Sequence, residues 1–501
     1  MNTQRSGRRI GIEAGLIILV IVVTLVARYM LPLTGPSLES VELHFLDTRF
    51  QMRGTLPPPD LQRIAKQVAI VAMDSDATRK FRRVIPRSVH ARLVRQLKKA
   101  GARAIIFDVL FIDPGNPADD RDFAAACAEA GNVFLPFDDN AVQPTPSNTL
   151  QAVQKKLSYP LVVPKTAQTI RLSPPVKPLF EAMSGGGHVV THGDNAGKFH
   201  SAVALMEADA VYPHVALDAV ARAVWHVQPQ QTAQIQLKDG YLTIGTHRIG
   251  PLTQRLLKRS LYSRSTQSLP RDTGADSNEL KRSRYRKSQV ERSGTAWMIP
   301  LNFIGYPSDL REHLYVPYLM ALEDAKQARE RLNGRIVIVG ETTAGTPDLR
   351  PGPFDTSEIT LGVETNATFI ANLLDNNFLR PAGQFWDVLA TVALTLISGV
   401  LVLALRPWFA ALLTSAVVLG YAFLATYLFG VYNIMLEMTA PLLSTVLGFI
   451  TLVTYRLVFE ERAARKNALR YREAETMLGH AYDTRLVQDL VDNPQKRTEL
   501  E

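Results

Sequence analysis

Cysteine is nearly absent from this sequence, since Cys127 is the single one among 501 residues. One cysteine excludes an internal disulfide, so a folded domain must be stabilised by an ordinary hydrophobic core. Recognisable catalytic patterns are missing too: no serine nucleophile elbow, Cys–His pair or set of kinase motifs occurs. We therefore expect these residues to hold no catalytic site, no resident metal ion and no cofactor.

Two short patterns imitate known sites without completing them. Gly340–Gly345 has the glycine spacing of a phosphate-binding loop, but Thr346 and Pro347 stand where that loop needs Lys and Ser or Thr. His188 and His192 follow a triglycine, without the glutamate that accompanies the two histidines of a zinc-binding helix. Neither pattern predicts a phosphate or metal site.

The formal net charge is +9, from 56 Lys and Arg residues against 47 Asp and Glu residues. The excess is concentrated between Lys258 and Arg292, so it does not predict a nucleic-acid partner. Because this stretch has few apolar residues it cannot bury a core, and we expect a mobile basic insertion over about residues 256–293. It is either a solvated insertion without a partner or a surface that binds anionic lipid head groups or polysaccharide.

Four apolar runs are each about long enough to cross a bilayer, which takes ~20 residues. They predict transmembrane helices over residues 10–31, 388–405, 408–432 and 438–455. Residues 32–387, between the first and second runs, are too polar for lipid and predict a large soluble region. Glu13 and Arg28 shorten the first run, but both side chains can extend toward the interface.

Lys and Arg close to the ends of spans mark the cytoplasmic side of a membrane protein. They occur in the tail of residues 1–9, at Arg406 between the second and third runs, and repeatedly in residues 456–501. Four spans make these three observations consistent and place residues 32–387 outside. A cleaved signal peptide at the first run remains an alternative, because a basic start and an apolar middle fit both.

The soluble region alternates short apolar runs with amphipathic stretches. Strands are predicted over residues 68–73, 104–107, 133–135 and 336–339; helices are predicted from Pro86 to Gly101 and over residues 119–130. Such alternation is typical of βαβ units. The fold class is therefore an α/β extracytoplasmic domain with a mainly parallel sheet, plus four transmembrane α-helices.

Ligands of parallel α/β sheets bind beyond the carboxyl ends of the strands. The residues expected to form such a site are Asp74, Arg87, His90, Asp108, Gly340 and Asp348. The helix that opens near Arg87 adds positive potential at its N-terminus, which favours a small anionic or zwitterionic ligand. Each aspartate also fits an ordinary turn or helix N-cap, so the site is a hypothesis.

Several segments resemble, in order, the sensor domain of the second CHASE type. They are Phe-Leu-Asp-Thr-Arg-Phe at 45–50 with Arg53 and Gly54, Val-Ala-Met-Asp at 71–74, Ile-Pro-Arg-Ser-Val-His-Ala at 85–91, Phe-Asp-Val-Leu-Phe at 107–111, Gly-Asn-Val-Phe-Leu-Pro at 131–136, Gly-Arg-Ile-Val-Ile-Val-Gly at 334–340 with Asp348, Gly-Val-Glu at 362–364 and Asn-Ala at 366–367. The family usually has histidine where Asn366 stands here, so no role of that histidine carries over. The basic insertion is a second departure.

The resemblance implies a receptor of the bacterial inner membrane. Such proteins hold the sensor outside, followed by three membrane helices and a cytoplasmic output domain, often an adenylate cyclase or a histidine kinase. Residues 478–494 resemble the stretch that precedes a class III adenylate cyclase domain. The expected function is a membrane-anchored extracytoplasmic sensor, the input half of a cyclase lacking its catalytic domain in these residues. Whether the protein is an enzyme stays open.

Two other functions remain possible at this point. One is a full adenylate cyclase whose catalytic domain is encoded beyond residue 501, and the other is a stand-alone membrane regulator that acts on a partner. The partners expected are an unknown extracytoplasmic ligand and membrane lipid.

Residues 455–478 predict one continuous helix leaving the membrane, because they lack Gly and Pro and are rich in Ala, Arg, Glu and Leu. Leu457, Ala464, Tyr471 and Leu478 recur every seven residues, the spacing of a coiled-coil seam. We expect a parallel homodimer through this helix, because class III cyclases form their active sites between two catalytic domains. A solvated single helix is the alternative.

Overall fold

The structure is a computed structural model that describes residues 2–31, 34–81, 84–139, 145–161, 171–190, 193–194, 197–228, 235–262, 287–343, 350–354 and 359–479. The chain divides into two compact units. The first comprises Ser40–Pro381 and Thr426–Met435 and is called the α/β unit. The second comprises Met1–Glu39, Ala382–Ala425 and Leu436–Glu501 and is called the helical unit.

Six strands form a parallel sheet in the α/β unit, in the order β12-β1-β13-β2-β3-β4. Their bounds are β1 Val68–Met73, β2 Ala104–Asp108, β3 Val133–Phe137, β4 Gly185–His188, β12 Tyr315–Pro317 and β13 Ile336–Glu341. Central β13 aligns Ile338 with Ile70 of β1 and with Ile106 of β2. The predicted parallel sheet is confirmed, and the four predicted strands are β1, β2, β3 and β13.

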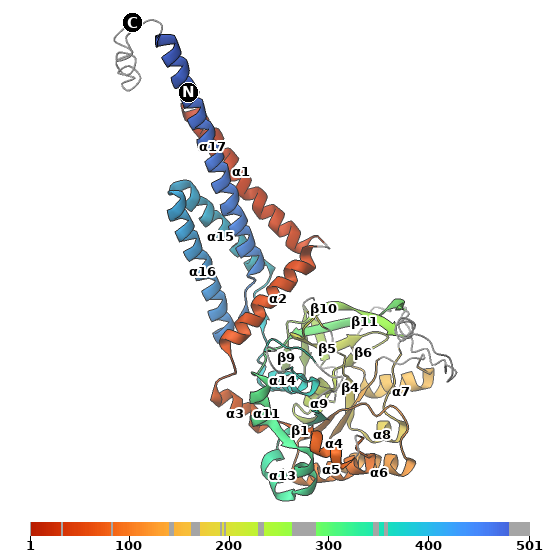
Figure 1. Ribbon diagram of the computed structural model, residues 1–501. Helices are drawn as coiled ribbons and strands as arrows, with labels where there is room; N and C mark the ends of the chain where they lie inside the picture. Colours follow the sequence, from red (N-terminus) through yellow and green to blue (C-terminus); the bar gives the residue numbers. More distant parts are fainter. Residues whose placement is uncertain are drawn as a thin grey trace, which may run out of the picture. The chain divides into compact units, whose positions relative to one another are not determined.

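Helices cover both faces of this sheet (Figure 1). One face carries α9 (Val215–Ala223) and α14 (Gly362–Asp375), which pack in one core cluster with Val68 and Ile70. The other face carries α5 (Arg87–Ala100), α6 (Pro117–Ala130), α12 (Tyr318–Glu323) and α13 (Ala325–Leu332). Alternate residues of a strand point to opposite faces, so a sheet buried on both faces needs the continuous apolar runs seen in the sequence.

Helix α5 begins and ends where its sequence predicts. Pro86 is its N-cap, and Gly101 follows its last turn in the left-handed conformation, with φ of 87°. Leu93, Val94 and Leu97 are buried on the sheet side. The periodicity of apolar residues and the terminal glycine therefore indicated the helix correctly.

The remaining elements of the α/β unit surround this core. The helices are α2 (Thr34–Arg53, of which residues 40–53 belong to this unit), α3 (Pro58–Gln67), α4 (Ser75–Lys80), α7 (Ser147–Leu157), α8 (Lys177–Ala182) and α11 (Pro307–Leu314). A four-stranded antiparallel sheet has the order β10-β11-β5-β6, with β5 Ser201–Glu207, β6 Val211–Pro213, β10 Thr253–Tyr262 and β11 Lys287–Pro300. A three-stranded meander comprises β7 Ile235–Lys238, β8 Tyr241–Ile244 and β9 His247–Ile249.

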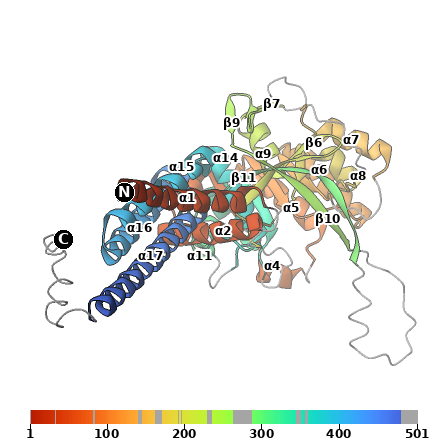
Figure 2. The same ribbon diagram turned by 90° about the horizontal axis from the view of Figure 1, so that it is seen from above.

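The two ends of the predicted mobile insertion are strands. Figure 2 shows β10 and β11 as a long antiparallel hairpin, in which Lys258 aligns with Arg292 and Arg259 with Glu291. The prediction of a mobile loop is wrong for these residues, while residues 263–286 lie outside the described part of the chain. Antiparallel pairing uses backbone groups, so a ladder begun by β11 against β5 can continue through a polar sequence.

Four helices of the helical unit are long and apolar enough to cross a membrane. They are α1 (Asn2–Tyr29), α15 (Gln384–Ala404), α16 (Pro407–Tyr432, whose last residues belong to the α/β unit) and α17 (Thr439–Gly479). All four predicted transmembrane helices are thus present as candidate spans. α1 packs against α15 and α17, where a side chain added to Gly399 would meet Ile17. Close approach at a glycine is typical of membrane helices.

The link between α16 and α17 contributes to the α/β unit. Its residues Ile434–Met435 form β15, which pairs in parallel with β14 (Arg380–Pro381) just before α15. Asn433 donates to Asn377 at 2.6 Å and accepts from Asn302 at 2.9 Å. Arg53 of α2 donates to the Oδ1 atom of Asn302 and thereby joins this asparagine network.

Candidate functional site

A cavity of about 480 Å³ lies at the carboxyl ends of β1 and β13. Met73 and Glu341, which are paired across these strands, line it together with residues 109–111 and 113–116 and the first turns of α5 and α6. Parallel strands end at one edge of a sheet, so the loops that follow them enclose a space there. Arg87 and His90, two of the predicted site residues, line this cavity.

Arg87 is fixed by three neighbours. Its Nη1 atom lies 2.5 Å from Oδ1 of Asp120, and its Nη2 donates to the backbone oxygen of Asp113. The guanidinium also lies 5.6 Å from the ring centre of Phe111. Its charge is therefore balanced within the protein, and its main local effect is to hold the loop before α6 against α5.

His90 is enclosed by aromatic rings. The rings of Phe107, Phe111, Phe123 and Tyr318 lie 5.5 to 5.8 Å from its own, and the hydroxyl of Tyr318 is 3.0 Å from Nδ1. Burial, and then the charge of Arg87, lower the pKa of His90 to about 3. The imidazole is therefore neutral at physiological pH and gives the cavity a polar but uncharged wall.

Three carboxylates give the cavity its charge. Asp113, Asp119 and Glu341 line it, and none of them forms an ion pair with another residue in the described part of the chain. Exposed Val84 and Leu110 add apolar surface to the same wall. Of the two ligand chemistries expected from the sequence, this lining fits a zwitterion better than an anion, because a cationic group would meet the carboxylates.

Three other predicted site residues lie outside the cavity wall. Asp74 caps α4, accepting from the backbone nitrogen of Ala77 at 2.9 Å. Gly340 allows β13 to approach α14, since an added Cβ would lie 2.9 Å from Val363. Asp108, at the end of β2, accepts from Asn366 of α14 at 3.0 Å. Asp348 lies outside the described residues.

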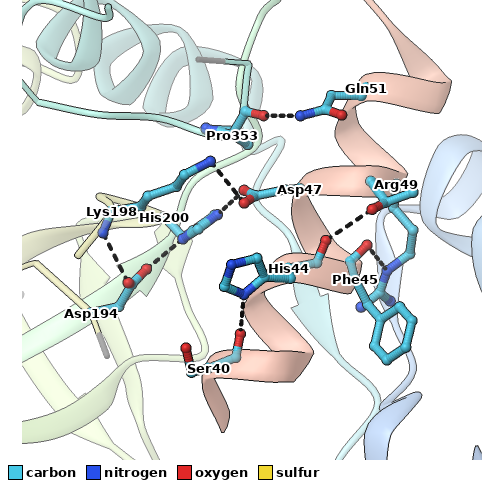
Figure 3. Close-up of polar contacts among 11 residues, drawn as sticks. Ser40, His44, Phe45, Asp47, Arg49, Gln51, Asp194, Lys198, His200 and Pro353 are labelled. Atoms are coloured by element: carbon cyan, nitrogen blue, oxygen red, sulfur yellow. Dashed lines mark hydrogen bonds and ion pairs between the residues drawn. The ribbon is translucent and has the colours of Figure 1, made fainter. Parts of the chain in front are cut away.

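A second cluster was not anticipated from the sequence. Figure 3 shows the ring of His200 between Asp47 of α2 and Asp194, with Lys198 beside them. Nε2 of His200 lies 2.7 Å from Asp47, Nδ1 contacts Asp194, and Nζ of Lys198 lies 2.8 Å from Asp47. The Phe45–Phe50 motif contains Asp47, and this is the one sign of the cluster in the sequence.

An α/β domain with a cavity at the carboxyl edge of its parallel sheet, in a chain with four candidate spans, has the parts of a membrane receptor. The comparison with protein families agrees: the model of the CHASE2 domain matches residues 17–404, which is more than half of the chain. The chain belongs to the CHASE2 family of sensor domains. The comparisons with curated proteins and with solved structures gave no match.

Proposed function

We propose that this protein is an extracytoplasmic sensor of the bacterial inner membrane that controls a cytoplasmic adenylate cyclase domain. The α/β unit binds a small ligand in the cavity at its sheet edge, and the helical unit carries the signal inward. The observation that carries the proposal is the position of that cavity in a CHASE2 sensor domain.

The distribution of basic residues supports the orientation. Arg456 donates to the backbone oxygens of Val402 and Leu405, so the end of α15, the turn at Arg406 and the basic part of α17 lie at one end of the helical unit. At the other end of these helices Arg28 pairs with Glu437, and no comparable basic excess occurs. Basic ends favour the cytoplasm.

The length of helix α17 supports a signal that is transmitted by movement of this helix. Its candidate span ends at Phe459, yet the helix continues to Gly479. Those 20 further residues extend about 30 Å at 1.5 Å per residue. The predicted continuous helix is thus present. The resemblance of residues 478–494 to a cyclase lead-in supports an adenylate cyclase domain joined to this helix, working as a homodimer.

Cysteine labelling tests the orientation. Native Cys127 is buried, so the wild-type chain gives little background. We expect Lys238→Cys, at the exposed end of strand β7, to react with a membrane-impermeant maleimide in spheroplasts, and Lys466→Cys in α17 to react after lysis alone. The reverse pattern would refute the proposed topology.

Ligand binding is tested with the full chain in lipid nanodiscs, using a panel of free amino acids as the zwitterionic probe. We expect at least one to raise the melting temperature, and Asp113→Asn with Asp119→Asn to abolish that rise. Glu129→Gln, on the same helix as Asp119 but outside the cavity wall, is the matched control. A rise that survives the double substitution places binding elsewhere.

A further inference from the structure

The ring of His200 bridges two carboxylates, one on each side. Its Nε2 faces Oδ1 of Asp47 at 2.7 Å and its Nδ1 faces Oδ2 of Asp194 (Figure 3). A neutral imidazole carries one N–H and one lone pair, whereas the cation carries two N–H groups. The imidazolium cation can therefore donate a hydrogen bond to both Asp47 and Asp194, whereas the neutral ring can donate to one of them. In the neutral form one carboxylate faces a lone pair.

The charges around the ring balance when it is protonated. Lys198 lies 2.8 Å from Oδ2 of Asp47, so the group holds two carboxylates, one ammonium and one imidazolium. His200 is 4 % exposed, and the Asp47 and Asp194 side chains are 9 % and 11 % exposed. Loss of the proton would leave a net negative charge in a shielded place, which is costly at low local dielectric.

Among the residues that the structure describes, the charges that act on the ring are those of Asp194 and Asp47. The segment at 350–354 meets this region through backbone oxygens of Pro351 and Pro353, while the charge of Arg350 bears on His214. The backbone nitrogen of Leu301 donates a hydrogen bond to the backbone oxygen of His200. Burial lowers the pKa of His200, but the hydrogen bonds and charges of Asp194 and Asp47 raise it, and the net direction is upward from 6.5.

The cluster joins two segments that are far apart in the chain. Asp47 lies on α2, the helix that follows α1, while Asp194, Lys198 and His200 precede β5 of the antiparallel sheet. Asp47 is the residue of α2 that carries the contact, and Gln51 one turn later donates to Pro353 at 3.1 Å. The protonation of His200 therefore contributes to how firmly this part of α2 is held, alongside Leu46 and Phe50, which pack in the core.

We propose that His200 is a proton-binding site through which the sensor responds to alkaline pH, and that loss of its proton weakens the attachment of Asp47 and so loosens α2 from the segment before β5. The response needs no ligand in the cavity at the sheet edge. The sign follows from linkage: a raised folded pKa gives stability that is fully present below about pH 6.5 and lost as pH rises through the folded value.

Hydrogen exchange of the full chain in nanodiscs tests the release. After correction for chemical exchange, protection of residues 40–53 should fall between pH 6.5 and pH 9, by about tenfold for each unit by which the pKa is raised. The fall should be absent in His200→Gln. His44→Gln is the matched control, because His44 is exposed on the same helix and contacts the backbone of Ser40; it should behave as wild type.

Magic-angle-spinning NMR of histidine-labelled wild-type chain in liposomes gives a second test that needs no folded variant. Both ring nitrogens of His200 should carry protons at pH 6.5, and one should lose its proton at a higher pH. A ring nitrogen that stays unprotonated from pH 6 to pH 9 would overturn the proposal. So would protection of residues 40–53 that does not depend on pH, or that falls equally in wild type and His200→Gln.

Discussion

Arg87 and Asp120 form an ion pair shielded from solvent, with side chains 14 % and 9 % exposed and N···O of 2.5 Å. Removing the Arg87 guanidinium leaves the mostly buried carboxylate of Asp120 without its cation. We therefore expect Arg87→Ala to lower the free energy of unfolding by about 3 kcal/mol. Arg95→Ala, which breaks more exposed pairs with Asp122 and Glu129, should cost about 0.5 kcal/mol. Denaturant unfolding of the purified chain measures both, and equal losses would contradict the shielding.

Buried neutral histidines should make the α/β unit acid-sensitive. Burial lowers the pKa of both His90 and His188 to about 3, so the unfolded chain binds more protons than the folded chain between pH 6.5 and pH 3. Stability should therefore fall as pH falls through this window. His90→Gln should reduce the slope by one proton, about 1.36 kcal/mol per pH unit. Unfolding at pH 6.0, 5.0 and 4.5 measures it, and an unchanged slope would show that His90 protonates in the folded state.

Arg456 closes the end of α15. Its Nη1 donates to the backbone oxygens of Val402 and Leu405 at 2.6 and 2.7 Å, which are among the carbonyl groups that a helix end leaves without partners. We expect Arg456→Ala to destabilise the helical unit by about 2 kcal/mol, since hydrogen bonds to charged groups contribute more than neutral ones. Arg462→Ala, on the same helix beyond the candidate span, is the control. Thermal unfolding in detergent measures the difference, and similar melting temperatures for the two variants would exclude this role.

The proposed dimer predicts a pattern of cross-links along α17. Cysteine at 464 or 471, on the predicted seam, should form disulfides between chains in membranes, whereas cysteine at 467 should not. Because Cys127 is buried, it should not compete. Non-reducing gel electrophoresis gives the answer, and equal cross-linking at all three positions would favour the solvated single helix.

Four of the six strands of the parallel sheet, and the candidate spans, could be predicted from the sequence because their signals are local. Val68–Met73 and the first five residues of β13, 336–340, are apolar without interruption, as strands covered on both faces must be, and the spans are longer still. The basic hairpin was not predicted, since pairing between β10 and β11 depends on backbone geometry rather than on composition.

The candidate site was harder to predict, because it depends on contacts between segments that are far apart in the sequence. Arg87 was placed at the sheet edge because it opens a helix after a strand, and this is where the structure has it. Asp74 lies at the same edge of the sheet, but its side chain accepts a hydrogen bond from the backbone at the start of α4. His200 was not predicted at all, because Asp47 lies 153 positions away and no periodicity connects them.

The asparagine network joins three segments of the α/β unit that are far apart in the sequence. Asn302 and Asn377 both bond Asn433, which precedes α17, and β14 leads directly into α15. The segment that precedes α15 and the link between α16 and α17 are thus joined to one another by hydrogen bonds within the α/β unit.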